Sequence, residues 1–162
     1  MKRLLMGYIG ICLTAYLVGC APKEIVRTDL ASIRANPEAF ADKRVILKTD
    51  IMELIHNPTP YDSMEIEVSG IVSKYSTGID WGFYLEDTSG ARVECYEYEY
   101  RHSPWVMVDA VVNRARDSHE NMTVAGFFKK GFGIELNWIE YQGQTYYTNY
   151  KPDVLGLPAF WP

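Results

Sequence analysis

Residues 64–72, MEIEVSGIV, contain the clearest strand pattern of the chain. Apolar and polar side chains alternate with a period of two, which places them on opposite faces of an extended strand. The two faces are Met64, Ile66 and Val68 on one side, and Glu65, Glu67 and Ser69 on the other. Gly70 interrupts the alternation, as a bulge or a sharp bend would. The stretch therefore predicts a strand that buries one face and bends near Gly70.

Further strand patterns follow at short intervals. WGFYLED (81–87) and RVECYEYEY (92–100) read as two strands around the turn DTSGA. WVMVDAVVNRARDSH (105–119) carries valines on one side and indicates a helix, although its β-branched content leaves a strand open. MTVAGFF (122–128) and IELNWIEY (134–141) predict two more strands around the turn KKGFG. The predicted order is three strands, one helix and two strands, so the chain is expected to be mainly β.

The segment before residue 64 predicts a smaller lead-in. Asp29 is placed to cap a helix over DLASIRANPEAF, which Asn36-Pro37 interrupts. KRVILKTDIMELI then begins with strand-like alternation, and HNPTPYD reads as a loop. About 20 residues separate KRVIL from MEIEV. Either the first strand contains an insertion, or Val45–Ile55 forms an extra strand or hairpin.

Several of these segments resemble a known kind of domain. EVSGIV, FYLEDTSG, VECY and TVAGFFKKGFGIELNWIEY resemble OB domains of the tRNA-anticodon-binding-like type, and NPEAFADKRVILKTD resembles a lead-in common in such exported bacterial proteins. The resemblance covers about residues 36–142. It implies a five-stranded OB-like barrel with one helix between the third and fourth strands, plus an N-terminal helix/strand lead-in. We therefore expect this domain over residues 29–145, with an aromatic C-terminal tail, residues 146–162, packed on it.

The first 20 residues, MKRLLMGYIGICLTAYLVGC, have the form of a secretory leader. Lys2 and Arg3 precede an apolar stretch of about 15 residues, which is short for a helix that spans a membrane. Leu17-Val18-Gly19-Cys20 resembles the lipobox of bacterial lipoproteins. The resemblance implies that Cys20 receives a diacylglycerol and that the leader is cut before it. An uncleaved anchor and an ordinary signal peptide are the alternatives.

The lipobox also implies where the protein is located. Residues 1–19 are expected to be a signal peptide and residues 20–28 a lipidated tether. Two or three acyl chains anchor a protein firmly, because each buried methylene contributes about 0.8 kcal/mol. Ala21 follows the cysteine, which resembles outer-membrane sorting in enteric-type bacteria. We expect a lipid-anchored cell-envelope protein in the outer membrane, facing the periplasm.

The bulk composition limits the choice of partner. The chain has 162 residues, of which 48% are hydrophobic and 14% aromatic, as in a globular domain. After residue 20, 14 Lys and Arg stand against 21 Asp and Glu, a formal charge of −7. Nucleic-acid-binding proteins gain much of their affinity from basic residues that neutralise phosphates. The acidic balance therefore argues against a nucleic-acid partner.

The second and third strands of the predicted barrel and its last hairpin supply the candidate binding residues. They are aromatic side chains and two neighbouring lysines: Trp81, Tyr84, Tyr96, Tyr98, Tyr100, Lys129 and Lys130. OB barrels bind ligands on this face, and aromatic rings stack on bases, sugars or peptide groups. Here the tyrosines alternate with glutamates rather than with Lys or Arg, which disfavours nucleic acid. The alternative is that the tyrosines cover the barrel wall or pack under the tail.

Neither a cofactor nor a metal is expected from the sequence. The chain contains no phosphate-binding loop, no dinucleotide fingerprint and no paired histidines. Glu97 and Glu99 fall on one strand face, and we interpret them as solvated carboxylates rather than cation ligands. Cys95 follows Val93 in the same strand pattern, so we interpret it as a small buried side chain.

Taken together, these patterns favour a non-catalytic lipoprotein. Its OB-like barrel is expected to bind a protein, peptide or glycan partner, and no catalytic residue is assigned. One alternative is a single-stranded nucleic-acid-binding module, which only fold analogy supports. The other is an envelope hydrolase that uses Asp80, Glu86 or Asp87 as a carboxylate pair, although acidic residues are common at turn ends.

Overall fold

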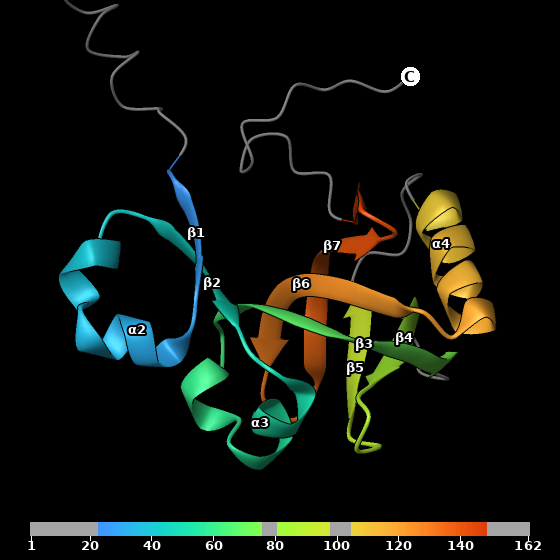
Figure 1. Ribbon diagram of the computed structural model, residues 1–162, viewed down its shortest axis with the longest axis horizontal. Helices are drawn as coiled ribbons and strands as arrows, with labels where there is room; N and C mark the ends of the chain where they lie inside the picture. The colour runs from blue at the N-terminus through green and yellow to red at the C-terminus, as the bar shows by residue number, and fades with distance from the viewer. Residues whose placement is uncertain (1–22, 76–80, 98–104, 149–162) are drawn as a thin grey trace, which may run out of the picture. The chain divides into compact units, whose positions relative to one another are not determined.

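The computed structural model describes residues 23–75, 81–97 and 105–148, apart from the side chains of Trp81 and residues 105–107. These residues form a mainly β structure, as the sequence predicts, in which eight strands join in one sheet (Figure 1). In chain order the elements are β1 (Ile25–Thr28), α2 (Leu30–Ala35), η1 (Pro37–Phe40), β2 (Arg44–Lys48), α3 (Ile51–His56), η2 (Thr59–Tyr61), β3 (Glu65–Tyr75), β4 (Trp81–Glu86), β5 (Arg92–Glu97), α4 (Trp105–Ser118), β6 (Asn121–Lys129), β7 (Gly133–Tyr141) and β8 (Gln144–Tyr147).

Five of the strands pair in a circuit. β3 pairs with both β4 and β6, β5 lies between β4 and β7, and β7 pairs with β6. All of these pairings are antiparallel except that of β5 with β7. α4 connects β5 to β6, so the predicted order of three strands, one helix and two strands is confirmed.

The main hydrophobic core lies within this circuit of strands. Each strand contributes completely buried side chains, among them Val68, Phe83, Cys95, Val124 and Leu136. α3 and α4 add further core residues from two places along the strands: Ile51 and Leu54 from α3, Val108, Val111 and Val112 from α4. α3 lies beside the β4–β5 turn, where the Ser89 hydroxyl is 3.8 Å from the Met52 sulfur, whereas α4 follows the other end of β5. The predicted helix with one valine-rich side is therefore confirmed.

The segment predicted as a tether is partly a strand. Residues 25–28 form β1, which pairs in parallel with β2 from Ile25 opposite Arg44 to Thr28 opposite Leu47. The sequence prediction over 20–28 is wrong in this part, because four residues are too short for alternation to stand out and their partner lies 19 positions ahead. The helix that follows is capped as expected: the Asp29 carboxylate accepts a hydrogen bond from the Ser32 N–H at 2.7 Å.

Residues 44–61 form an extra strand followed by a helix, rather than a hairpin or an insertion within the first barrel strand. β2 pairs in parallel with β3, with Leu47 opposite Ile66. A parallel pair needs a crossover connection, and α3 with η2 supplies it. Asp50 begins α3, since its carboxylate accepts a hydrogen bond from the Glu53 N–H at 2.7 Å.

Gly70 lies next to Ile71, where β3 passes from its pairing with β6 to its pairing with β4, and it allows close packing there. It pairs regularly with Met122 of β6, and the irregularity in β3 lies between Val72 and Lys74. A Cβ atom on Gly70 would lie 2.6 Å from the Glu86 carbonyl oxygen of β4. The glycine therefore allows β3 and β4 to approach each other at this point.

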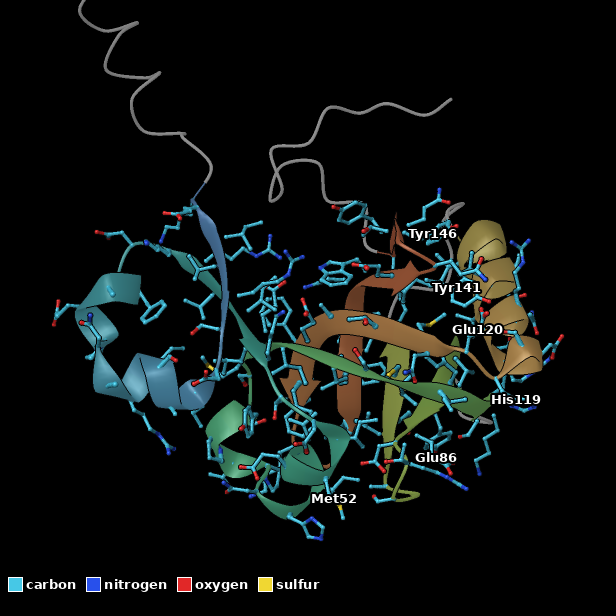
Figure 2. All side chains as sticks on the ribbon, viewed as in Figure 1. Met52, Glu86, His119, Glu120, Tyr141 and Tyr146 are labelled. Atoms are coloured by element: carbon cyan, nitrogen blue, oxygen red, sulfur yellow. The ribbon has the colours of Figure 1, made fainter. Side chains whose placement is uncertain are left out.

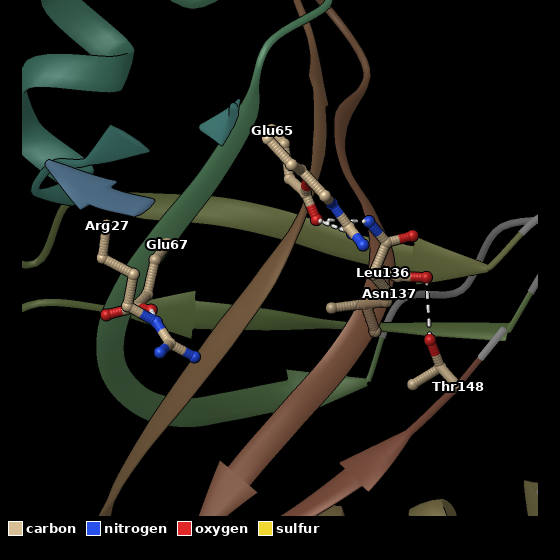
Figure 3. A network of polar contacts seen from close by, with 7 residues as sticks. Arg27, Glu65, Glu67, Leu136, Asn137 and Thr148 are labelled. Carbon is tan, nitrogen blue, oxygen red and sulfur yellow. Dashed lines mark hydrogen bonds and ion pairs between the residues drawn. The ribbon is translucent and has the colours of Figure 1, made fainter. Parts of the chain in front are cut away.

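The two glutamates on the polar face of β3 are largely covered, while Ser69 on the same face is exposed. Met64 is 37% exposed although the alternation puts it on the face expected to be buried, and Glu65 is only 6% exposed. Arg44 of β2 donates to Glu65 from Nε at 2.8 Å. Asn137 of β7 donates to the same carboxylate at 3.0 Å (Figure 3). Glu67 accepts from Arg27 of β1 at 2.7 Å. The lead-in strands thus lie against charged residues of β3.

A one-residue irregularity in β7 completes this cluster. Ala125 of β6 lies opposite Trp138 and Gly126 opposite Leu136, so Asn137 is an extra residue in β7. Such a bulge redirects side chains, and Asn137 reaches Glu65 while Trp138 lies under the Arg27 guanidinium, 5.5 Å from the ring centroid. The bulge therefore joins β7 to the lead-in as well as to its neighbouring strands.

The end of the domain lies beyond the predicted boundary at residue 145. β8 pairs antiparallel with β7 across that position, from Gln144 opposite Tyr141 to Tyr147 opposite Trp138. The Thr148 hydroxyl is buried and donates to the Leu136 carbonyl oxygen at 2.7 Å (Figure 3). Tyr146 and Tyr147 therefore belong to the sheet, Thr148 is hydrogen-bonded to it, and the rest of the predicted tail, 149–162, lies outside the described residues.

Tyr75 links β3 to α4 and is expected to make stability depend on pH in alkaline solution. Its hydroxyl donates to Asp109 at 3.2 Å, and Arg116 lies 5.1 Å from the ring centroid. Burial, together with the Asp109 charge and hydrogen bond, raises the pKa of Tyr75 from 10.0 to about 12. Tyr75 therefore loses its proton at a lower pH in the unfolded chain than in the folded protein. The contribution of Tyr75 to stability is complete below pH 10 and is lost as pH rises towards 12.

The test is the free energy of unfolding of the wild-type protein and of Tyr75→Phe between pH 9 and pH 12. We expect the difference between the two proteins to change in favour of Tyr75→Phe as pH rises through this window. Parallel pH profiles would contradict the raised pKa.

Candidate binding surface

The outer face of β4 and β5 presents the candidate aromatic residues. Side chains of the two strands alternate between the core and the exterior, and the register sets the outer ones side by side: Tyr84 opposite Glu94, Glu86 opposite Arg92, and Tyr96 opposite Gly82. We call Tyr84, Glu86, Arg92, Glu94 and Tyr96 the β4–β5 surface. Tyr84 and Tyr96 point away from the core, and both are partly exposed.

Tyr84 lies at the middle of this surface. Its neighbour on β3 is Lys74, whose ammonium lies 5.0 Å from the centroid of the Tyr84 ring. The Tyr84 hydroxyl donates to Glu94 of β5 at 3.4 Å. Lys74, Tyr84 and Glu94 therefore form a row across three strands that combines a cation, an aromatic ring and a carboxylate.

The carboxylates considered for hydrolysis have other contacts. Glu86 accepts from the Arg92 Nε at 2.6 Å across the β4–β5 pair. Asp87 closes the turn, accepting from the Ser89 hydroxyl at 2.6 Å and from the Ala91 N–H at 3.1 Å. The hydrogen bonds from Ser89 are the main reason why the pKa of Asp87 is lowered. Both groups thus hold the hairpin together, and Asp80 lies outside the described residues.

The two candidate lysines lie at different distances from this surface. Lys129 forms an ion pair with Glu135 of β7 at 2.5 Å, and Glu135 lies opposite Tyr96 in the β5–β7 register. Lys130 is held elsewhere: its ammonium donates to the Thr59 hydroxyl at 3.1 Å, and its backbone N–H donates to Asp62 at 2.9 Å. The structure therefore brings Lys129 to the edge of the β4–β5 surface and ties Lys130 to η2 and the residue after it.

Some of the candidate residues are not described. The Trp81 backbone lies opposite Glu97, but its side chain is outside the described part of the structure, as are Tyr98, Tyr100 and Cys20. The interpretation of the tyrosine row as a covered wall therefore concerns residues beyond this description, apart from Tyr96.

The interior of β5 differs from one sequence interpretation. Cys95 is fully buried as predicted, and burial raises the pKa of its thiol. Glu97 was interpreted as solvated, but it follows Val93 and Cys95 on the inward face and is only 3% exposed. The alternation of the strand was the signal that could have found this buried carboxylate, since it places residues 93, 95 and 97 on one face.

The cations on and around the β4–β5 surface each lie beside an acidic or an aromatic side chain. Lys74 lies over Tyr84, Arg92 is paired with Glu86, and Lys129 with Glu135. Such a surface offers a ligand aromatic rings for stacking and polar groups for hydrogen bonds, but no excess of positive charge. Within residues 23–75, 81–97 and 105–148, no cluster of three or more His, Cys, Asp or Glu side chains is suited to hold a metal ion.

Comparison with known protein families finds no match, and comparison with curated proteins finds no similar sequence. Among the helices that the structure describes, none is both long and apolar enough to cross a membrane.

Proposed function

We propose that the protein is a lipid-anchored envelope protein whose OB-like barrel binds a protein, peptide or glycan partner on the β4–β5 surface, without catalysing a reaction. The fold part of the proposal is supported by the circuit of pairings β3–β4–β5–β7–β6–β3. Such a circuit is expected of a five-stranded OB barrel in which β3 is the first strand and α4 lies between the third and fourth strands. In such barrels the second and third strands, here β4 and β5, form the ligand face.

The row of Lys74, Tyr84 and Glu94 is the observation that carries the binding proposal. An aromatic ring that a cation and a carboxylate hold in place loses little freedom on binding, so it suits a ligand with both apolar and hydrogen-bonding groups. Peptides and glycans have this character. Nucleic acid would instead favour cations that are available for phosphate, whereas the cations here lie beside acids or aromatic rings.

Removal of the Tyr84 and Tyr96 rings is expected to weaken binding. For a chain of residues 21–162, we expect the double variant Tyr84→Ala/Tyr96→Ala to bind a peptide library or soluble peptidoglycan fragments about tenfold more weakly than the wild type, measured by fluorescence titration. Tyr147→Ala is the matched control, because Tyr147 is an exposed tyrosine on β8. Equal losses in both variants, or no binding to either probe, would contradict the proposal. Salt-sensitive binding to single-stranded oligo-dT alone would favour the nucleic-acid alternative.

The lipid anchor has its own test. Cys20→Ser is expected to abolish incorporation of an alkyne-labelled fatty acid and to leave the leader uncut, because the thiol is the acyl acceptor in the proposed processing. Cys12→Ser, which changes the other leader cysteine, is expected to keep both the label and the cleavage. In-gel fluorescence and the mass of the membrane-bound protein measure the two outcomes. A Cys20→Ser protein that is still labelled and cut would exclude this anchor.

A further inference from the structure

One end of the strand circuit gathers most of the exposed apolar side chains in the described residues. β3 begins here, β6 ends, β7 begins, and the β4–β5 turn lies at the same end, as the strand registers require. α3 and η2 precede β3 and lie at this end too, with Met52 next to the β4–β5 turn (Figure 2). We call this region the α3 end. Its exposed apolar residues are Met52, Ile55, Met64, Phe127 and Phe132.

Phe132 is the most exposed of them and is held in place by its flanking residues. It lies in the β6–β7 turn with 73% of its surface accessible. Gly131 and Gly133 beside it have φ values of +83° and +124°, which only glycine adopts without strain. Gly133 also packs against the Glu94 carbonyl oxygen so closely that a Cβ atom there would overlap it. The turn therefore presents the ring from a fixed backbone.

The same turn is fastened to the α3 side of this end. Lys130 donates from its backbone to Asp62 and from its side chain to Thr59, both next to or within η2. Two backbone hydrogen bonds, Ser63 N–H to the Phe128 carbonyl at 2.8 Å and Phe128 N–H to the Met64 carbonyl at 3.0 Å, join the adjoining segments. Preorganised apolar groups bind with less loss of conformational entropy, so this arrangement suits a docking surface.

The charges at the α3 end are mainly negative. Its carboxylates accept hydrogen bonds from neutral groups: Asp50 from the Glu53 N–H, Glu53 from the Asn57 amide, Asp62 from the Lys130 N–H and Asp87 from Ser89. Hydrogen bonds of this kind satisfy a carboxylate without cancelling its charge. Three cations lie at or beside this end: the Lys130 ammonium is directed to a hydroxyl, while Lys129 and Arg92 are neutralised by ion pairs with Glu135 and Glu86. Exposed apolar groups among carboxylates match a partner with the opposite charge.

We propose that the α3 end is a docking surface for a cationic, amphipathic segment of a partner protein, with Phe132 as its main anchor. The apolar side of such a segment would cover Phe132 and the methionine and isoleucine side chains of α3, while its lysines or arginines lie near Glu53 and Asp62. A bilayer fits less well, because the carboxylates repel anionic lipid headgroups. This surface adjoins the β4–β5 surface at the β4–β5 turn but uses other side chains, and the inference does not depend on the function proposed for that face.

The probe is a fluorescent 14-residue peptide of leucine and lysine with a helical amphipathic pattern, and its control has every lysine replaced by glutamate. The protein is the chain of residues 21–162, which contains the whole compact unit Ile25–Tyr150. Anisotropy titrations are expected to show at least tenfold tighter binding of the lysine peptide, with an advantage that shrinks as salt is added. Equal affinity for the two peptides would overturn the proposal.

Two pairs of variants distinguish binding at this surface from a general attraction of the cationic peptide to an acidic protein. Phe132→Ser is expected to weaken binding of the lysine peptide about tenfold, while Tyr147→Ser, an exposed aromatic on β8, leaves it unchanged. Glu53→Gln is expected to weaken it about threefold, and Glu140→Gln, near the opposite end of β7, to have no effect. Equal effects within either pair would overturn the proposal. Sedimentation of the wild type, but not of Phe132→Ser, with phosphatidylcholine vesicles would instead assign the surface to lipid.

Discussion

Arg44→Met is expected to lower the free energy of unfolding by about 3 kcal/mol, because it leaves a buried carboxylate without its cation. Glu65 has only 5% of its side chain exposed, and Arg44 approaches it with two guanidinium nitrogens. The hydrogen bond to Glu65, together with the Glu65 charge, also raises the pKa of Arg44. Urea unfolding followed by circular dichroism measures the loss.

Lys48→Met is the matched control for this substitution. Lys48 also lies on β2 and pairs with a β3 glutamate, but the distance to Glu67 is 3.5 Å and 57% of the lysine side chain is exposed. Such pairs contribute little, and Glu67 keeps its contact with Arg27, so we expect a change within about 0.5 kcal/mol.

The combined variant Arg44→Met/Glu65→Leu tests the cause of the loss. If the uncompensated charge of Glu65 is responsible, removing both charges should recover most of the stability, since apolar replacements of a buried pair are tolerated. A double variant as unstable as the sum of its parts would show that packing, rather than charge, fastens the lead-in to β3. Equal effects of Arg44→Met and Lys48→Met would contradict the prediction outright.

The strands of the circuit and α4 could be predicted because their signals are local. In β3, β5 and β7 a period of two is visible within six to eleven residues, and no distant contact is needed to recognise it. In β5 the alternation puts Tyr96 on the outer face and Glu97 on the inner face, but the charge of Glu97 favours the opposite interpretation.

The remaining features depend on contacts that the sequence pattern does not contain. Glu65 and Glu67 look like a solvent face, and they are covered only because Arg27 and Arg44 arrive from strands 40 and 21 positions earlier. The extra residue Asn137 goes with a change of phase in the apolar pattern, from Ile134 and Leu136 to Ile139 and Tyr141, but the pattern does not tell which strand pairs across it. The sequence likewise gives no sign that Lys130 has a partner. It donates hydrogen bonds to Asp62 and Thr59, about 70 positions before it. Tertiary pairing decides each of these cases.

Gly126→Ala tests whether that bulge fixes how β6 and β7 approach each other. Gly126 lies beside the irregularity, opposite Leu136. A Cβ atom there would overlap the Glu135 carbonyl oxygen and lie 2.9 Å from the Leu136 Cα, so the obstacle is backbone that no side-chain rotation can relieve. We expect a loss of about 3 kcal/mol in the free energy of unfolding.

Gly131→Ala separates this close approach from the general effect of replacing a glycine. Gly131 has a φ of +83° but nothing within 4 Å of its added Cβ atom, so only the left-handed conformation opposes the change, at about 1 kcal/mol. Thermal and urea unfolding of the two variants therefore differ if the strands pack as described. Because Gly126 has no such positive φ, a loss no larger than that of Gly131→Ala would mean that β7 can move away from β6 at little cost. In that case the bulge would not be what holds Asn137 beside Glu65 and Trp138 beneath Arg27.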